Sequence, residues 1–134
     1  MSETVQIKTP WLASKDPEVP STLNYSTLSM CGRVEEMVGQ DPNYIAYEFM
    51  GKTTTYAEMW QKINACAKSL KAIGIREGDK VTICMPNAPQ TLCMFYAVNM
   101  VGAIANMVHP LSAESEIAFY LRDSGSVAAI TLDQ

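Results

Sequence analysis

The chain has 134 residues, 48% of them apolar and only 18% charged, which fits one globular domain and excludes a disordered segment. Its formal net charge of −4 lacks the basic surplus that binding to a phosphate backbone requires, so we exclude nucleic acid as a partner. The four cysteines are widely spaced and accompany a single histidine, which excludes a zinc site and predicts reduced, mostly buried thiols.

The first part of the chain predicts an extended arm. Residues 1–24 hold three prolines, little periodicity and no apolar run of the kind found in a signal peptide. We expect Trp11 and Leu12 to pin this arm to the body. The remaining residues, 25–134, are then expected to form one α/β unit.

A helix and a strand are expected to follow the arm. Apolar residues at helical spacing favour a helix within residues 26–42, which Gly39 and the proline at 42 would stop. Residues 44–49 alternate in the manner of a half-buried strand.

Gly51-Lys52-Thr53 admits two interpretations, the tail of a nucleotide-binding loop or a turn. A phosphate-binding loop needs a second glycine five positions earlier, where this chain has Ala46. The bulky residues between them would not form a nest of backbone N–H groups around a phosphate. We therefore favour a two-residue hairpin turn in which Gly51 leads and supplies the positive φ.

A long amphipathic helix is predicted next. Thr55 and Glu58 are spaced as a capping box, and apolar residues then trace one face of a helix over almost five turns. Gly74 is expected to end this helix, with Ile75 placed for a Schellman-type contact.

Strands and helices then alternate to the end of the chain. Apolar runs predict buried strands at residues 80–85 and 103–108 and a third strand at 127–132, joined by a helix that starts within residues 86–89 and runs to 101 and by a helix over 112–123. Short links between such elements produce a right-handed parallel α/β unit. The expected fold class is thus α/β, a parallel sheet with flanking helices behind an N-terminal β-hairpin. We expect this sheet to be incomplete, because a further crossover would follow the last strand.

The longest apolar stretch does not predict a transmembrane segment. Residues 93–108 are interrupted by Asn99, Gly102 and Asn106, and they fall short of the roughly 20 apolar residues that span a bilayer. We instead expect a buried helix that runs into a buried strand.

Two long segments resemble a known family. They are TTTYAEMWQKINACAKSLKAIGIREGDKVTICMPNAPQ (53–90) and FYAVNMVGAIANMVHPLSAESEIAFYLRDSGSVAAIT (95–131). In this order they are similar to the N-terminal part of the adenylate-forming (AMP-binding) superfamily, most of all to its long-chain fatty-acid–CoA ligases. His109 stands where the family often has Asn before the proline, and we assign it no catalytic role.

The resemblance implies the N-terminal portion of an ATP-dependent fatty-acid–CoA ligase. Such an enzyme activates a fatty acid as an acyl-adenylate and transfers it to CoA, with ATP, Mg²⁺ and CoA as cofactors. The family's Gly-rich phosphate loop, magnesium-binding Glu, ribose-binding Asp and catalytic Lys have no counterpart in this sequence. We therefore assign no catalytic residue and no metal ligand, and we expect the fragment alone to be inactive. The expected location is the cytoplasm, with peripheral association with a membrane left open.

One binding contact follows from the resemblance. In the family, the loop after the strand at residues 103–108 lies near the nucleotide end of CoA, which points to Pro110, Leu111 and Ser112. The alternative for Ser112 is a structural role as the N-cap of the following helix.

Three other functions stay open. The chain could be a stand-alone α/β module that binds a nucleotide or CoA, although no glycine-rich turn follows its parallel strands. It could form a homo-oligomer through an exposed sheet edge. It could also belong to an adenylating enzyme for another carboxylic acid.

Overall fold

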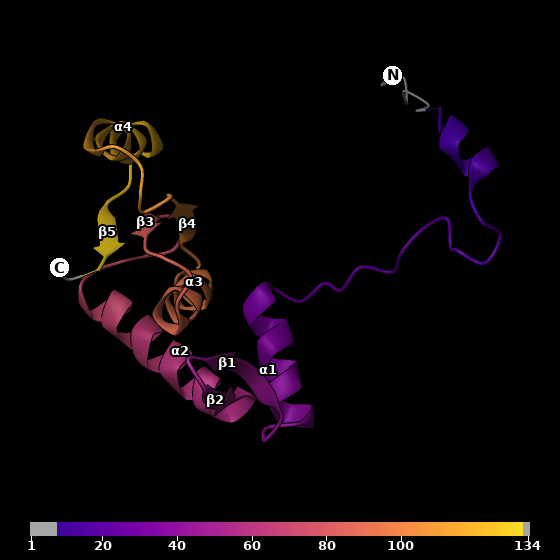
Figure 1. Cartoon of the computed structure of the whole chain (residues 1–134), viewed down its shortest axis with the longest axis horizontal. Helices are drawn as coiled ribbons and strands as arrows, with labels where there is room; N and C mark the ends of the chain where they lie inside the picture. The colour runs from indigo at the N-terminus through magenta and orange to yellow at the C-terminus, as the bar shows by residue number, and fades with distance from the viewer. Residues whose placement is uncertain (1–7, 133–134) are drawn as a thin grey trace.

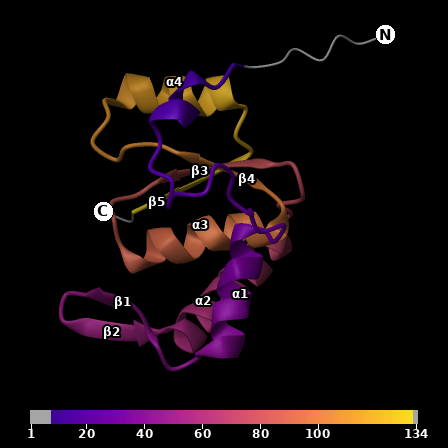
Figure 2. The same ribbon diagram turned by 90° about the vertical axis from the view of Figure 1, so that its right-hand side faces the viewer.

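The computed structural model describes residues 8–132 as two small sheets and their helices (Figures 1 and 2). The elements in chain order are a 3₁₀ helix (Pro10–Ser14), α1 (Met30–Gln40), β1 (Ile45–Phe49), β2 (Lys52–Thr55), α2 (Tyr56–Ala72), β3 (Lys80–Cys84), α3 (Pro89–Val101), β4 (Ile104–Met107), α4 (Glu114–Ser124) and β5 (Ala128–Thr131). The predicted α/β class, with a parallel sheet and a preceding hairpin, is confirmed.

The larger sheet has the strand order β4-β3-β5, and both neighbours run parallel to β3. Helix α3 lies on one face of this sheet and α4 on the other, as both views show (Figures 1 and 2). Helix α2 packs mainly against α3, α1 packs against both of these helices, and the β1–β2 hairpin packs against α2. The sheet is therefore covered on both sides, as in other doubly wound folds.

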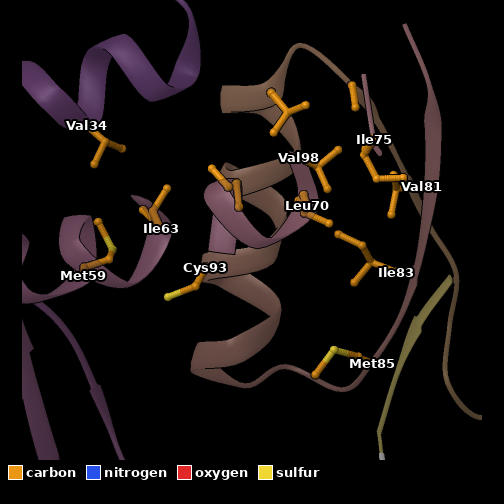
Figure 3. Close-up of a cluster of buried hydrophobic side chains, with 14 residues drawn as sticks. Val34, Met59, Ile63, Leu70, Ile75, Val81, Ile83, Met85, Cys93 and Val98 are labelled. Carbon is orange, nitrogen blue, oxygen red and sulfur yellow. The ribbon is translucent and has the colours of Figure 1, made fainter. Parts of the chain in front are cut away.

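The hydrophobic core lies between α2, α3 and the α3-facing side of the sheet (Figure 3). Ile63 on α2, Val98 on α3, and Val81 with Ile83 on β3 are completely buried, with exposed fractions of 0%. Burying an aliphatic side chain of this size stabilises the fold by about 1.5–3 kcal/mol relative to leaving it exposed. These contacts fix the position of β3, whose carboxyl end borders the candidate site described below.

The opposite side of the sheet is polar. Thr82 lies between Val81 and Ile83 on β3, so its side chain points away from the core. Its hydroxyl oxygen lies 2.7 Å from Ser126 Oγ and accepts a hydrogen bond from Asn106 Nδ2 at 3.0 Å. These bonds join β3 to β4 and to the segment between α4 and β5.

The two outer strands, β4 and β5, are only partly buried. Strand β3 is buried from Val81 to Cys84, as expected, whereas β4 and β5 contain half-buried and exposed residues. Among residues 8–132, each of these two strands pairs with β3 alone, and α4 has no buried residue. The prediction of a buried strand at residues 103–108 is therefore wrong for β4.

The hairpin interpretation of Gly51-Lys52 is confirmed, with a correction to the turn position. The two turn residues are Met50 and Gly51, with φ of 49° and 77°, as a type I′ turn requires. Lys52 already pairs with Phe49 in the β1–β2 ladder, so Gly51 is the second turn residue and not the first. This segment forms no phosphate-binding nest.

The N-terminal arm does not pack on the body in the expected way. Trp11 is 62% exposed and Leu12 41% exposed, and their short 3₁₀ helix has no buried residue. Figure 1 shows the segment before α1 running outward from the folded part. The prediction that these two residues pin the arm is therefore wrong.

Helix α1 is anchored to α3 by the side-chain amide of Asn99, a polar residue that interrupts the apolar stretch at residues 93–108. Asn99 Oδ1 accepts the Cys31 N–H at 3.2 Å, one of the N–H groups that the first turn of a helix leaves unpaired. The Cys31 thiol donates to Tyr96 O at 2.9 Å, and Ser29 Oγ caps the same turn through the Gly32 N–H. The helix ends at Gln40, so Gly39 lies inside it and does not stop it as expected.

The cysteine prediction is confirmed. All four thiols are free; Cys66 is half-buried and the other three are buried. Burial raises the pKa of the Cys31, Cys66 and Cys93 thiols, which lowers the fraction of reactive thiolate at neutral pH.

Helix α2 begins with the predicted capping box, which is confirmed. Thr55 Oγ1 accepts the Glu58 N–H at 3.3 Å, and Glu58 Oε2 accepts the Thr55 N–H at 2.9 Å. At the other end Gly74 has φ of 96°, and the Ile75 N–H donates to Leu70 O at 3.0 Å, as in a Schellman motif.

The capping box predicts a measurable dependence of stability on pH. The Thr55 backbone N–H, and then the Thr55 hydroxyl, lower the pKa of the exposed Glu58 carboxyl. Because the pKa is lower in the folded state, this stabilisation is complete above the ordinary glutamate pKa and is lost as the pH falls through the folded pKa. Glu58→Gln is therefore expected to give a shallower loss of stability on acidification.

Urea unfolding of the Glu58→Gln variant at a series of pH values measures this effect. Glu48→Gln is the matched control, because Glu48 is an exposed carboxylate on β1. Equal acid dependence in the wild type and in Glu58→Gln would refute the assignment.

Candidate functional site

A pocket of about 440 Å³ lies at the carboxyl ends of the three parallel strands. The chain passes from β3 to β4 through α3 on one face and from β4 to β5 through α4 on the other. Ligands of open α/β sheets bind at such a point, where the direction of winding reverses. The lining residues come from the segments after all three strands: Met85, Pro86, Asn87, His109, Pro110, Leu111 and Leu132.

The loop after β4 is a tight turn held by His109. Its carbonyl oxygen accepts the Ser112 N–H at 3.1 Å, which closes a four-residue turn with Pro110 at the second position. Its ring Nδ1 accepts the Leu111 N–H at 3.2 Å. Of the three residues that the resemblance singles out, Pro110 and Leu111 line the pocket, whereas Ser112 only closes the turn.

Ser112 is not the N-cap of the next helix. The cap is Ala113, and α4 runs from Glu114. Glu116 Oε2 accepts the Ala113 N–H at 3.1 Å, which is the carboxylate half of a capping box, and Ala113 has no hydroxyl to supply the other half. The capping prediction for Ser112 is therefore wrong by one position.

The wall opposite this turn is the loop between β3 and α3. Thr91 Oγ1 donates to Pro86 O at 2.6 Å, which ties the loop to the first turn of α3. Helix α3 starts at Pro89, and its N-cap, Ala88, makes no side-chain capping bond. The N-terminus of α3 carries the positive end of a helix dipole, and no described lining residue carries a formal charge when His109 is neutral.

A second hollow of about 340 Å³ separates the hairpin from α3. Its walls are mostly apolar, and Asn87 borders both hollows. Sequence reasoning missed it because its two sides come from distant segments. They are Tyr47, Glu48 and Phe49 on one side and Asn87, Ala88, Pro89, Thr91, Leu92, Phe95 and Met107 on the other.

Within residues 8–132 no three His, Cys, Asp or Glu side chains lie close enough together to hold a metal ion. No helix in that range is long and apolar enough to cross a membrane.

Residues 34–134 match the family model of the AMP-binding enzymes. The chain belongs to the AMP-binding enzyme family. It is 30% identical over 129 residues to a long-chain-fatty-acid–CoA ligase of Bacillus subtilis, an alignment that covers 96% of this chain and 23% of the relative. It is also 30% identical over 97 residues to an acetyl-coenzyme A synthetase of Methanothrix thermoacetophila, covering 68% of this chain and 15% of the relative.

The family's solved structures share the fold of this chain. The N-terminal domain of FACL13 from Mycobacterium tuberculosis superposes with a TM-score of 0.70 at 35% identity, over 73% of this chain and 25% of that one. The prediction of an N-terminal subdomain of the adenylate-forming fold is therefore confirmed. The chain spans less than a quarter of the length of the curated relatives that it matches, from 12% to 23%.

Proposed function

We propose that this chain is the N-terminal portion of an ATP-dependent fatty-acid–CoA ligase and that the turn at residues 109–112 contacts CoA. The observation that carries the proposal is the pocket at the carboxyl ends of β3, β4 and β5. Its place in the fold is the one that α/β proteins use for ligands. The fatty-acid–CoA ligase relative aligns over nearly the whole chain.

The residues of the pocket suit the nucleotide end of CoA. The pocket volume of about 440 Å³ lies within the roughly 300–1,000 Å³ of small-molecule sites. Pro110 and Leu111 offer apolar surface to a base, and Leu111 is 86% exposed although it is a large aliphatic side chain. Pro86 and Asn87, in the loop that leads into α3, line the same pocket.

We assign no residue of this chain to the binding of ATP or Mg²⁺. The described residues offer no cluster of metal ligands, and no glycine-rich turn follows β3 or β4. The carboxylate-activating step is therefore assigned to the longer protein, and this chain supplies the scaffold of strand ends that borders the reaction site.

A titration monitored by NMR tests the CoA contact. Adding CoA, or adenosine 3′,5′-bisphosphate as its nucleotide end, to this chain is expected to shift the Leu111 and Ser112 amide signals. Inorganic phosphate at the same concentration is the control for a nonspecific anion effect. Shifts confined to other parts of the chain, or no shift at millimolar ligand, would overturn the proposed contact.

A pair of variants sharpens the same titration. Leu111→Ala removes exposed apolar surface from the pocket and is expected to weaken CoA binding about three- to tenfold, the effect of losing about one to two buried methylenes. Val127→Ala is the matched control, because Val127 is 62% exposed and precedes β5 at the opposite end of the strand. If the two variants bind CoA with equal affinity, Leu111 does not contact CoA.

The second candidate for the substrate of the whole protein is a carboxylic acid other than a long-chain fatty acid. The acetyl-coenzyme A synthetase relative favours it, since that enzyme is named for a two-carbon acid. An assay of the complete reading frame that carries this chain, with ATP, CoA and acids of increasing length, distinguishes the two. Faster thioester formation with long-chain acids supports the fatty-acid ligase, and a preference for acetate supports the alternative.

A further inference from the structure

The imidazole of His109 is used in an unusual way. Its Nδ1 accepts the Leu111 N–H at 3.2 Å, two residues along the chain, inside the turn that its own carbonyl oxygen closes with the Ser112 N–H at 3.1 Å. The side chain of an Asn or Asp commonly makes this local bond to a following backbone N–H. An imidazole can replace it only while Nδ1 keeps its lone pair.

This bond sets the protonation state of the ring. A neutral imidazole has one donor nitrogen and one acceptor nitrogen, so acceptance at Nδ1 places the proton on Nε2. In the imidazolium form both nitrogens are donors, and the bond to the Leu111 N–H cannot exist. Histidine is also the side chain whose ordinary pKa, about 6.5, lies nearest to physiological pH.

We propose that His109 is a positioning residue that makes the pocket turn sensitive to pH. The neutral ring holds Leu111 in its place on the pocket wall. Protonation removes the acceptor, releases the Leu111 N–H and loosens the turn. The consequence for CoA rests on the function proposed above, whereas the coupling between the ring and the turn does not.

Few charged or titratable groups face the His109 ring, so few of them could compete with it for control of the turn. Residues 85–87 and Leu132, which line the pocket with His109, contain no titratable group. On β3 the Cys84 thiol approaches the His109 carbonyl oxygen at 3.9 Å. On α4 the first turn carries Glu114 and Glu116, and the Glu116 carboxylate is already bound to the Ala113 N–H.

The single histidine of the chain makes a direct test feasible. Nitrogen-15 NMR of the ring reports the tautomer and its titration, and the Leu111 amide reports the turn in the same sample. We expect the Nε2–H tautomer at high pH, and a Leu111 amide shift that follows the ring titration with the same midpoint. Loss of this hydrogen bond is expected to speed exchange of the Leu111 amide about fivefold after correction for its intrinsic pH dependence.

Two substitutions separate the hydrogen bond from the charge. His109→Asn keeps an acceptor for the Leu111 N–H but does not titrate, so its Leu111 amide is expected to stay protected at every pH. His109→Phe removes the acceptor, and its Leu111 amide is expected to exchange rapidly at every pH. The proposal would be overturned if the Leu111 amide shift does not follow the ring titration in the wild type. It would also be overturned if that shift changes with pH to the same extent in His109→Asn.

The ligand measurement distinguishes this proposal from the proposed function. Adenosine, which is uncharged, serves as the probe because a protonated ring would itself attract phosphate. If the turn titrates but neither adenosine nor CoA shifts Leu111, the CoA contact fails and the coupling stands. If the ligands bind but Leu111 ignores the ring, the coupling fails and the contact stands. If both hold, affinity for adenosine is expected to fall several-fold below the His109 titration in the wild type and to stay constant in His109→Asn.

Discussion

Replacing Ile83 by Ala is expected to lower the free energy of unfolding by about 3–4 kcal/mol. Ile83 is completely buried at the centre of β3, between the two outer strands and against α3. The variant loses the transfer free energy of the deleted methyl and methylene groups and leaves a cavity that the surrounding backbone cannot close. Because small domains are stable by only about 5–15 kcal/mol, this single change removes a large part of the total.

Urea unfolding followed by circular dichroism measures the loss. Ile104→Ala is the matched control, since Ile104 lies on the adjacent strand β4 but is 52% exposed. The control is expected to lose less than about 1 kcal/mol, the range for substitutions at exposed sites. Similar losses in the two variants would contradict the assignment of the core to the α3-facing side of the sheet.

Replacing Gly102 by Ala is expected to cost about 2–3 kcal/mol, for two reasons that act together. Gly102 ends α3 with φ of 83°, a conformation that a residue with a Cβ adopts only with strain. An added Cβ would also stand 3.0 Å from Glu77 Cγ and 3.3 Å from Glu77 Cβ. The contact cannot relax easily, because Gly102 O accepts the Gly78 N–H at 3.0 Å and holds the two segments together.

Two further glycine variants separate strain from contact. Gly125 ends α4 with φ of 64° but has open space around it, so Gly125→Ala measures the conformational cost alone, about 1 kcal/mol. Gly39 lies inside α1 with open space around it, and Gly39→Ala is expected to be neutral or stabilising. Among the three variants, Gly102→Ala is expected to have the lowest thermal unfolding midpoint. If Gly125→Ala costs as much as Gly102→Ala, the contact with Glu77 contributes nothing.

Features set by neighbouring residues could be predicted from the sequence. The capping box of Thr55 and Glu58 and the end of α2 at Gly74 depend on bonds that span a few residues, so spacing alone identifies them. The order of strands and helices was predictable for the same reason. The exact turn residues were not, because the register of β1 against β2 decides that Lys52 pairs with Phe49 and leaves Met50 in the turn.

Features set by distant contacts could not be predicted. Asn99 looks like an interruption of an apolar stretch until α1 brings the Cys31 N–H to it. The burial of β4 and β5 depends on what lies beside them, which their own apolar sequences do not encode. For the site, the resemblance pointed to Pro110 and Leu111, and both line the pocket. The bond from the Leu111 N–H to His109 Nδ1 was missed, although a His-Pro pair at a strand end is a usable signal for such a turn.

Because α4 has no buried residue, we expect it to open locally at a lower free energy than the core, so that the molecule behaves as two cooperative units. Amide protons in α2, α3 and β3, which carry the core, are expected to exchange only on global opening. Those of α4 are expected to exchange through local opening, which needs less free energy. The turn at residues 109–112 is the junction between the two units. A ligand that contacts both this turn and the loop at residues 85–87 would hold the two units together. Binding of such a ligand is therefore expected to slow hydrogen exchange of the α4 amides, and that slowing measures how much of the pocket is occupied.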